Sequence, residues 1–388
     1  MYKSVEFPKL PNAKVAHDFL SRMTGSGAIG SSRKVDRPLA IYGAGNLGRM
    51  AREYLDRLGI KLEFVVDANA EKYREDDYWS GIAIVSPDDV LPEMQQSVML
   101  AVCVVTSPYV SLATALKDAG WEDVVPFYDV AEAYRDVHPL SNGWFAKPFS
   151  QVNLENISTV LQNWEDDLSR AHHLQFIAWR RLREEWIFND ATVTNDNRFF
   201  IPEVTTMLGK NESFADVGAH TGNVTTRFID ETKGQFKKIW DIEPDPDNLL
   251  LLTSAISALP SEIADRVEII PATMGSKPGE EKFFRGIGYA SQRSKLGQHM
   301  HQIETIDSLG IAPSFIKLHL EGGELDALKG ACDTILKSRP IIAATSYHND
   351  QGIWELPMWL MDNLTNYRFY MRVHSWCGTG AVVYALPN

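Results

Sequence analysis

The feature that most constrains the fold of this chain is an apolar strand that runs into a glycine turn. Residues 213–223 read SFADVGAHTGN, with Asp216 near the end of the apolar run and Gly218 and Gly222 in the turn. Glycine at these places permits a tight reversal and lets the backbone approach a ligand closely. A plain strand-to-helix turn needs the same residues, so the turn alone leaves a nucleotide site and a structural turn open.

An acidic residue follows the next predicted strand, over residues 238–242, at the spacing of a ribose ligand. Glu243 lies about twenty residues beyond the turn, where the carboxylate of a nucleotide-binding fold accepts from ribose hydroxyls. Asp245 and Asp247 are expected only to cap the helix that starts near Pro246. The turn and Glu243 together predict S-adenosylmethionine as the cofactor.

The residues predicted to bind this cofactor come from three successive strand ends. Asp216 would accept from the ammonium group of the cofactor or hold the turn in place. No carboxylate follows the third strand, so the backbone or Thr273 would contact the adenine. The predicted cofactor-binding residues are Asp216, Gly218, His220, Gly222, Glu243 and Thr273.

Strand-like and helix-like segments alternate over most of the chain, which predicts an α/β fold with two Rossmann-like domains. The first domain is expected over residues 1–148 and the second over 149–388, with a helical lead-in at 149–210. Aromatic residues at helical spacing in the lead-in are predicted to be core, namely Trp164, Phe176, Trp179 and Trp186. The strands of the first domain are predicted at 39–42, 62–66, 82–85, 98–105 and 123–126. Those of the second domain are predicted from Ser213 and at 238–242, 267–270, 315–320, 341–346, 368–374 and 381–386. Seven strands with the last two close together are typical of a class I methyltransferase sheet.

The segment 315–330, FIKLHLEGGELDALKG, closely resembles the signature of FkbM-family methyltransferases. The resemblance extends over residues 199–386. The other segments and residues that are similar to the family are the turn at Asp216, the segment 303–309, Tyr347, His348 and His374. It implies transfer of a methyl group from S-adenosylmethionine, usually to an oxygen of a sugar or a secondary metabolite. The chain departs from the family at His220, where Asn is usual, and at His319, where Asp is usual.

Methyl transfer to a poorly acidic hydroxyl needs an aligned oxygen and a base. The residues predicted to be catalytic are His319, Glu321 and His348. His319 would act as the base or be a hydrogen-bonded structural histidine, and His348 with Asp350 offers another base. Glu324 matches an acid of the family, or it would only favour the start of a helix. A divalent ion would suit His319, Glu321 and His348, but their spacing demands none, and no metal is predicted.

A glycine-containing basic stretch, Arg285–Lys295, continues through His299 and His301 in an otherwise acidic protein. We expect it to form a substrate loop whose positive charge holds a phosphate or carboxylate of the acceptor. A solvated surface loop is the alternative.

The first domain carries a second glycine turn. Gly43, Gly45 and Gly48 follow a predicted strand and open a helix, and Asp67 ends the next strand, which makes a dinucleotide fingerprint in its expected context. The unit resembles nucleotide-binding half-domains that accompany sugar-modifying enzymes. It would bind NAD or another nucleotide such as a nucleotide-sugar, or it would be structural or dock a partner.

The charge and the cysteine content limit the possible binding partners of the protein and its expected cellular compartment. A formal net charge of -13 argues against an extended nucleic-acid-binding surface, because such a surface needs clustered Lys and Arg. The three cysteines, Cys103, Cys332 and Cys377, are too scattered for a disulfide framework or a zinc site and fit a reducing cytoplasm. No apolar stretch is long enough for a membrane span, and the N-terminal residues lack a signal-peptide pattern.

Three functions fit the sequence. The first is an O-methyltransferase that acts on a small-molecule or saccharide acceptor and uses its first domain to recruit a substrate or partner. The second is an NAD-dependent oxidoreductase with an accessory second domain. The third is a nucleotide-sensing, nucleotide-sugar-binding or assembly protein whose methyltransferase-like domain has lost its chemistry. A homo-oligomer is compatible with each.

Overall fold

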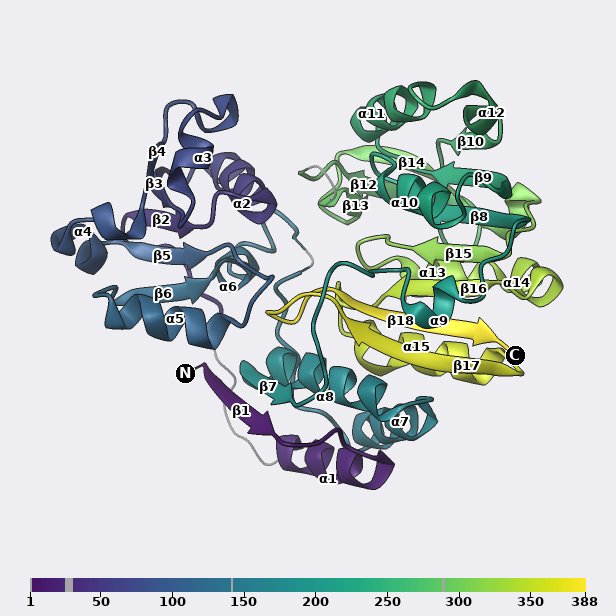
Figure 1. Ribbon diagram of the computed structural model, residues 1–388, viewed down its shortest axis with the longest axis horizontal. Coiled ribbons are helices and arrows are strands. Elements are labelled where there is room, and N and C mark those ends of the chain that lie inside the picture. The colour runs from purple at the N-terminus through teal and green to yellow at the C-terminus, as the bar shows by residue number, and fades with distance from the viewer. Residues whose placement is uncertain (1, 25–30, 141, 288–289) are drawn as a thin grey trace.

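The structure is a computed structural model that describes residues 2–24, 31–140, 142–287 and 290–388. It has a mixed α/β fold with two open sheets, which lie on the left and right of Figure 1 and turn strand ends toward one another. A layer of helices below them in the same view joins the two sheets. Among the described residues, no helix is long and apolar enough to cross a membrane.

The first sheet has five parallel strands in the order β4-β3-β2-β5-β6. They are β2 (Leu39–Tyr42), β3 (Leu62–Val66), β4 (Ala83–Val85), β5 (Met99–Val102) and β6 (Asp123–Pro126), which lie where the sequence predicts strands. Their helices are α2 (Asn46–Arg57), α3 (Ala70–Arg74), α4 (Pro92–Ser97), α5 (Tyr109–Asp118) and α6 (Phe127–Glu132). The strands are continuous apolar runs because a parallel sheet is buried on both faces. The chain reverses its direction across the sheet between β2 and β5.

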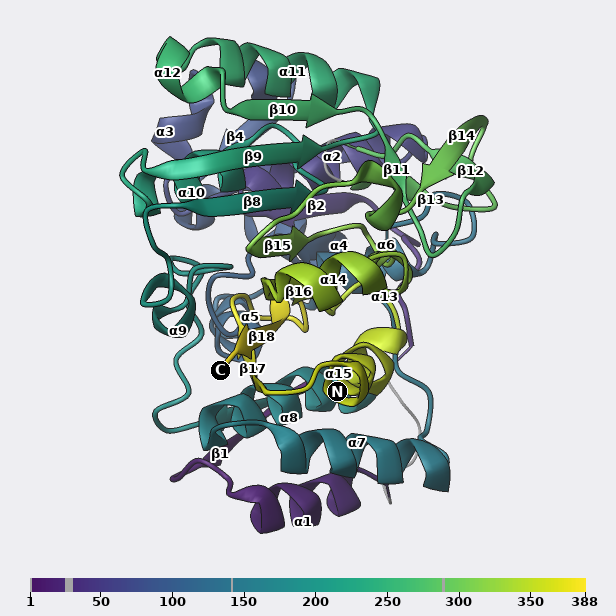
Figure 2. The same cartoon turned by 90° about the vertical axis from the view of Figure 1, so that its right-hand side faces the viewer.

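The second sheet has seven strands in the order β10-β9-β8-β15-β16-β18-β17, stacked from top to bottom in Figure 2. They are β8 (Glu212–Val217), β9 (Phe236–Ile242), β10 (Val267–Ile270), β15 (Phe315–Leu318), β16 (Ile341–Thr345), β17 (Tyr367–Val373) and β18 (Ala381–Pro387). All seven lie at the positions predicted from the sequence. Strand β18 is antiparallel to both β16 and β17. The direction of the chain reverses between β8 and β15, so ligands are expected at the carboxyl ends of these two strands.

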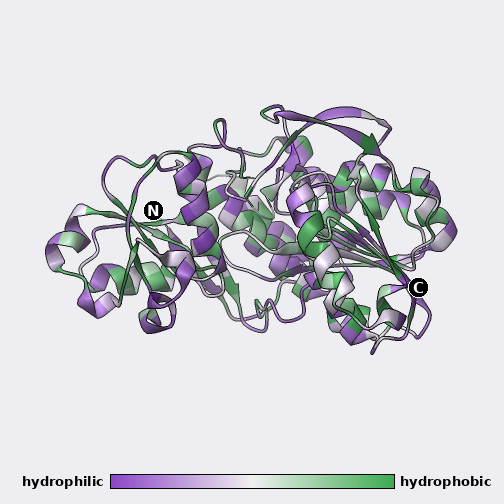
Figure 3. Ribbon diagram, turned by 90° about the horizontal axis from the view of Figure 1, so that it is seen from above, coloured by the Kyte–Doolittle hydropathy of each residue, from purple (hydrophilic) through white to green (hydrophobic). Residues whose placement is uncertain are grey.

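Helices cover both faces of the second sheet. They are α9 (Pro202–Thr205), α10 (Asn223–Glu231), α11 (Pro246–Ser257), α12 (Ser261–Ala264), α13 (Glu324–Lys329), α14 (Cys332–Ser338) and α15 (Gln351–Asn363). Figure 3 shows hydrophobic and hydrophilic residues alternating around the helices, as expected of helices that cover a sheet on one side and meet water on the other.

A small sheet between β10 and β15 was not foreseen from the sequence. Its strands are β11 (Thr273–Met274), β12 (Gly279–Phe284), β13 (Gln292–Arg293) and β14 (His299–Glu304), in the order β11-β14-β12-β13. The predicted substrate loop therefore connects strands of this sheet, and Gln292 and Arg293 within it form β13. Gly288 and Tyr289 of that loop lie outside the described residues.

The N-terminal segment packs with the second part of the chain, which differs from the predicted domain boundary. Strand β1 (Lys3–Phe7) pairs in parallel with β7 (Glu184–Phe188). Helix α1 (Ala13–Thr24) packs on α7 (Gln151–Asn163) and α8 (Asp167–Leu182), and its apolar residues join their core. Residues 3–24 thus belong with the helical lead-in and not with the first sheet.

The aromatic residues predicted as core in the lead-in are buried. Trp164 and Phe176 belong to the core beneath the second sheet, and Trp186 lies there on strand β7 and not on a helix. Trp179 belongs to the core of the first sheet although it lies on α8. Helix α8 therefore contributes side chains to the cores of both sheets.

Candidate functional site

The turn after β8 has room only for glycine at position 218. Gly218 has φ +83°, and a Cβ atom there would lie 2.1 Å from the carbonyl oxygen of His319. Gly222 has φ +85° and precedes α10 as its N-cap. His220 between them has φ +54°, a region in which Asn is also favoured, which accounts for the Asn usual in the family at this position. The predicted glycine turn is therefore present at the switch point of the sheet.

Asp216 lies beneath the turn and is fully buried. Its Oδ1 accepts from the ammonium of Lys317 at 2.7 Å, and the same ammonium donates to the carbonyl oxygen of Gly218 at 2.7 Å. Of the two roles predicted for Asp216, these contacts support holding the turn. Lys317 was not identified from the sequence, although it stands directly opposite Asp216 on the neighbouring strand.

A second buried carboxyl group lies beside Asp216. Asp241 stands opposite Asp216 on β9, and its Oδ1 accepts from the hydroxyl of Thr225 at 2.6 Å. Burial, and next the Asp216 carboxylate, raise the pKa of Asp241 to about 8. Three adjacent strands thus carry a lysine and two acids beneath the turn, with one of the acids protonated near neutral pH.

Glu243 directly follows β9 and faces the turn. Its Oε2 accepts from the backbone N–H of His220 at 2.8 Å, and its Oε1 accepts from the N–H of Asp245 at 2.9 Å. Burial raises the pKa of Glu243, and these hydrogen bonds act against that rise. Asp245 caps α11 through the N–H groups of Asp247 and Asn248, in line with the capping role expected of it.

A pocket opens above Gly218 on the side of Glu243. Met274 and Phe283 contribute apolar surface to it, and Ser291 and Arg293 approach it from the small sheet. The predicted site residues that line it are Gly218, His220, Glu243, Thr273, His319 and Glu321. The hydroxyl of Thr273 is within hydrogen-bonding distance of Nδ1 of His301, at 3.1 Å. The structure therefore gathers residues from β8, β9, β11 and β15 around one pocket.

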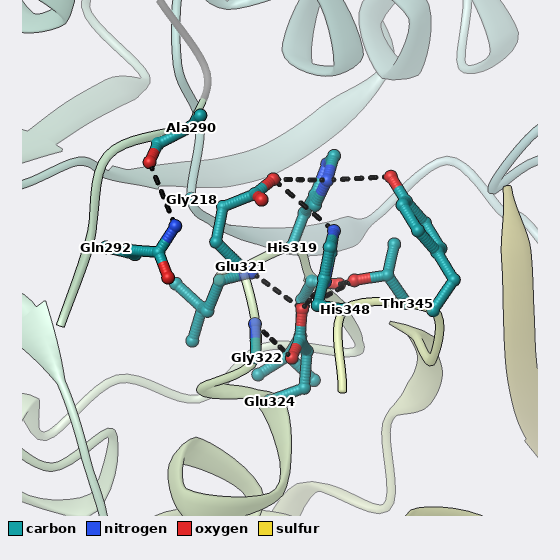
Figure 4. A network of polar contacts seen from close by, with 12 residues as sticks. Gly218, Ala290, Gln292, His319, Glu321, Gly322, Glu324, Thr345 and His348 are labelled. Carbon is teal, nitrogen blue, oxygen red and sulfur yellow. Dashed lines mark hydrogen bonds and ion pairs between the residues drawn. The ribbon is translucent and has the colours of Figure 1, made fainter. Parts of the chain in front are cut away.

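His319, Glu321 and His348 converge beside this pocket (Figure 4). Oε1 of Glu321 lies 3.3 Å from Nε2 of His319 and 3.3 Å from Nε2 of His348. Nδ1 of His348 lies 2.8 Å from Oε1 of Glu324, whose carboxylate also accepts from the hydroxyl of Thr345 at 2.7 Å. The three residues predicted to be catalytic thus form one cluster, with Glu324 behind His348.

The charges in this cluster are set by burial and by the carboxylates. Burial lowers the pKa of His319 to about 3, so its imidazole is neutral near pH 7. Burial acts against a charged His348, but Glu321 and Glu324 raise the pKa of His348 well above its usual value. Burial likewise acts against a charged Glu321, but His348, and next His319, lower its pKa. His348 is therefore an imidazolium between two carboxylates when nothing else is bound.

Two residues that the sequence left without a role border the cluster. The hydroxyl of Tyr347 lies 3.1 Å from Nε2 of His319 and accepts from Nη2 of Arg198 at 2.7 Å. The hydroxyl of Tyr347 therefore links the Arg198 guanidinium to the ring of His319. Tyr347 belonged to the predicted signature, but Arg198 has no sequence signal of its own.

The arginines of the expected substrate loop are paired with acids. Arg285 contacts Asp247 at 2.5 Å, and Arg293 lies 2.7 Å from Asp326 and 3.3 Å from Glu281. These pairs offset the charge of both arginines, and the role expected for the segment in holding an anionic acceptor stays a prediction. The segment also forms part of the wall of the pocket beside Glu243.

The glycine turn of the first sheet is held by the same kind of contact as the glycine turn of the second sheet. Oδ2 of Asp67 accepts from the N–H of Ala44 at 2.7 Å, as Glu243 accepts from His220 in the second sheet. A Cβ atom at Gly48 would lie 2.0 Å from the carbonyl oxygen of Gly43, so α2 can pack on the turn only with glycine there. The glycine turn, the helix and the acidic residue of the predicted fingerprint therefore lie together as expected, and binding of a nucleotide there stays a prediction.

The two glycine turns open into one cleft of about 800 Å³ between the sheets. Gly43, Gly45 and Asp67 line it from the first sheet. Gly218, His220, His319, Tyr347 and Arg198 line it from the second. Because Gly218, His220 and His319 also line the pocket beside Glu243, the cleft and the pocket meet at these residues.

A seven-stranded sheet with a glycine turn and a pocket at its switch point is a methyltransferase-like α/β fold. Residues 216–371 match the family model of the methyltransferase FkbM domain, so the predicted resemblance is confirmed for this part of the chain. The protein is also similar in structure to an FkbM methyltransferase from Methylobacillus flagellatus KT. That match has a TM-score of 0.60 and 19% sequence identity, and it covers 96% of this chain and 98% of the other.

Other solved methyltransferases match about half of the chain. A precorrin-6y C5,15-methyltransferase from Geobacter metallireducens GS-15 has a TM-score of 0.31 and 16% identity, over 52% of this chain and 95% of its own. A SAM-dependent methyltransferase from Aquifex aeolicus has a TM-score of 0.29 and 14% identity, over 48% of this chain and 88% of its own. No curated protein matches the chain by sequence.

Proposed function

We propose that the protein is an S-adenosylmethionine-dependent O-methyltransferase that acts on a hydroxyl of a sugar, a saccharide or a secondary metabolite. The observation that carries the proposal is the pocket at the switch point, where the Gly218 turn and Glu243 meet within the segment that matches the methyltransferase FkbM domain. The cofactor supplies an electrophilic methyl group when it is bound.

The residues of the pocket fit this cofactor. Gly218 lets the turn pack closely against the backbone of His319, where a Cβ atom would collide, and both residues line the pocket. Glu243 holds the turn through His220, and its partly satisfied carboxylate is placed to accept from ribose hydroxyls. Thr273 and Met274 provide the polar and apolar contacts for the adenine.

The acceptor hydroxyl enters from the cleft in this proposal. His319 separates the pocket from the cleft, so an oxygen placed beside it faces the cofactor. A neutral imidazole with a lowered pKa is a weak base, and His348 as an imidazolium cannot take up a proton. His319 and Tyr347 therefore contribute mainly by orienting the acceptor, and alignment supplies most of the rate.

The first domain binds the acceptor in this proposal. Gly43, Gly45 and Asp67 face the same cleft as His319, so one elongated ligand can contact both glycine turns. The N-terminus of α2 lies at this turn and favours a phosphate group. A nucleotide-linked sugar has both parts that such an arrangement needs. Binding of NAD by the first domain has no support from the comparisons.

Calorimetry with the intact protein tests the cofactor. We expect S-adenosylmethionine and S-adenosylhomocysteine to bind and Glu243→Ala to weaken both at least about tenfold, because ribose contacts and the hold on His220 are lost together. Glu268→Ala, on the exposed face of the neighbouring strand β10, is the matched control and should bind like the parent. Failure of both sulfur compounds to bind the parent protein would reject the proposal. Labelled cofactor with saccharides and sugar nucleotides then identifies the acceptor.

A further inference from the structure

His348 has a buried nitrogen that the protein leaves without a hydrogen bond. The side chain is 1% exposed, and Nε2 has no hydrogen-bond partner among the described residues, although Oε1 of Glu321 lies 3.3 Å away. Buried polar atoms are nearly always satisfied, so such an atom calls for an explanation. The ring of His348 also stacks on that of His319, with centroids 5.1 Å apart.

The distances around this nitrogen suit a metal ion. One ligand atom from each of His319, Glu321 and His348 can be chosen so that all three lie within 4.8 Å of one another. Two ligand atoms that are each about 2.1 Å from one ion lie about 3 Å apart when their bonds are at right angles. The two distances of 3.3 Å from Glu321 are close to that value, so only the two imidazole nitrogens need to draw together.

The surroundings of the three residues hold them in this arrangement. Glu324 binds Nδ1 of His348, which is the carboxylate–histidine contact that orients a metal-binding imidazole and fixes its tautomer. Glu324 is itself fixed by the N–H groups of Leu320 and Gly322 and by the hydroxyl of Thr345. Glu321 has φ +50°, a strained backbone conformation of the kind that accumulates at ligand sites.

We propose that His319, Glu321 and His348 bind one divalent first-row transition-metal ion and that Glu324 is a positioning residue for His348. Two imidazoles and one carboxylate are ligands that such ions favour, whereas Mg²⁺ and Ca²⁺ favour oxygen ligands alone. The ion replaces the contact between Tyr347 and Nε2 of His319, and it also replaces the proton on Nε2 of His348, which is released to the solvent. Its remaining coordination positions are open to the acceptor.

The ion has a chemical role at this place, and that role rests on the proposed function. The cluster lies where the pocket meets the cleft, so a bound ion can hold the oxygen of an acceptor hydroxyl and lower its pKa. Binding of the ion itself does not depend on methyl transfer.

Visible absorption of Co²⁺ tests the site without any activity measurement. The full-length protein, freed of metal with a chelator, is titrated with Co²⁺, and we expect one saturating equivalent with absorption bands of nitrogen and oxygen ligands. Glu321→Gln and His319→Asn should each remove the bands, and Glu324→Gln should lower the affinity about 10- to 100-fold while the bands remain. His319 is the second variant because its side chain is partly exposed, at 19%, and its replacement disturbs the core least.

The control is His299→Asn, which removes an exposed histidine outside the cluster and should bind Co²⁺ like the parent. The proposal is wrong if the parent shows no saturable bands, or if His299→Asn and Glu321→Gln behave alike. Calorimetry with S-adenosylmethionine on the same samples separates the two proposals. Bands without cofactor binding retain the ion site and remove methyl transfer, whereas cofactor binding without bands removes only the ion site.

Discussion

The buried charges beneath the Gly218 turn act as a group. Lys317 faces Asp216 across one pair of strands, and Asp241 faces Asp216 across the next. One ammonium cannot balance two carboxylates at this depth, so the second acid, Asp241, keeps its proton. The sequence pointed to Asp216 but not to the other two, because a lysine and an aspartate within apolar strands become partners only once the order of the strands is known.

Asp241 should make stability depend on pH. An unfolded aspartate has a pKa of about 3.9, whereas in the folded protein burial and the Asp216 carboxylate raise the pKa of Asp241 to about 8. Between these values the folded state holds a proton that the unfolded chain has lost, so stability falls as the pH rises and levels off above about 8. Asp241→Asn removes this contribution. The difference in the free energy of unfolding between the variant and the parent should grow in favour of the variant from about pH 5 to about pH 8, by at most about 1.4 kcal/mol per pH unit.

Urea unfolding across this pH range measures the slope. Asp265→Asn, an exposed aspartate beyond α12, is the control and should follow the parent at every pH. Parallel stability curves for Asp241→Asn and the parent would show that Asp241 is ionised in the folded protein.

At the scale of elements, the sequence predicted those helices and strands that depend on residues close together in the chain. Every strand of the two large sheets was located, because buried parallel strands are short apolar runs between turn residues. The pairing of β1 with β7 was missed because its two strands are separated by most of the first domain. The small sheet β11-β14-β12-β13 was not predicted, since β12 has a mostly exposed, polar sequence that resembles a surface segment.

Helix α2 gives a test of the first glycine turn as a packing element. Gly48→Ala should lower the free energy of unfolding of the first domain by about 1–3 kcal/mol, because its Cβ atom would lie 2.0 Å from the carbonyl oxygen of Gly43 and push the helix off the turn. Gly45→Ala is the matched control. It has φ -73° and no neighbouring heavy atom closer than 3.9 Å to the added carbon, so it should change stability little. Equal stability of the two variants would mean that the turn adjusts without cost.

At the scale of the whole molecule, the cleft keeps its shape through contacts between the two parts of the chain. Arg183, at the end of α8, lies 3.0 Å from Asp129 of α6, and both side chains are buried. The hydroxyl of Tyr2 donates to the same carboxylate at 2.6 Å. Glu185 of β7 accepts from the N–H groups of Tyr109 and Val110 and so caps α5 of the first domain. The sequence could not predict these contacts, because each joins residues that are far apart in the chain.

The pair of Arg183 and Asp129 should therefore hold the two domains together. Arg183→Met leaves the Asp129 carboxylate buried without its cation, which should lower the free energy of unfolding by about 3–5 kcal/mol. Adding Asp129→Leu to this variant should restore part of the loss, because no charge is then buried. Arg227→Met breaks the exposed pair with Glu231 on α10 and is the control, with an expected cost of about 0–1 kcal/mol. Denaturant unfolding followed by tryptophan fluorescence measures all of these variants. A loss for Arg183→Met no larger than that for Arg227→Met would show that this buried pair does not hold the domains together, and that the contacts of Glu185 and the apolar core along α8 do so instead.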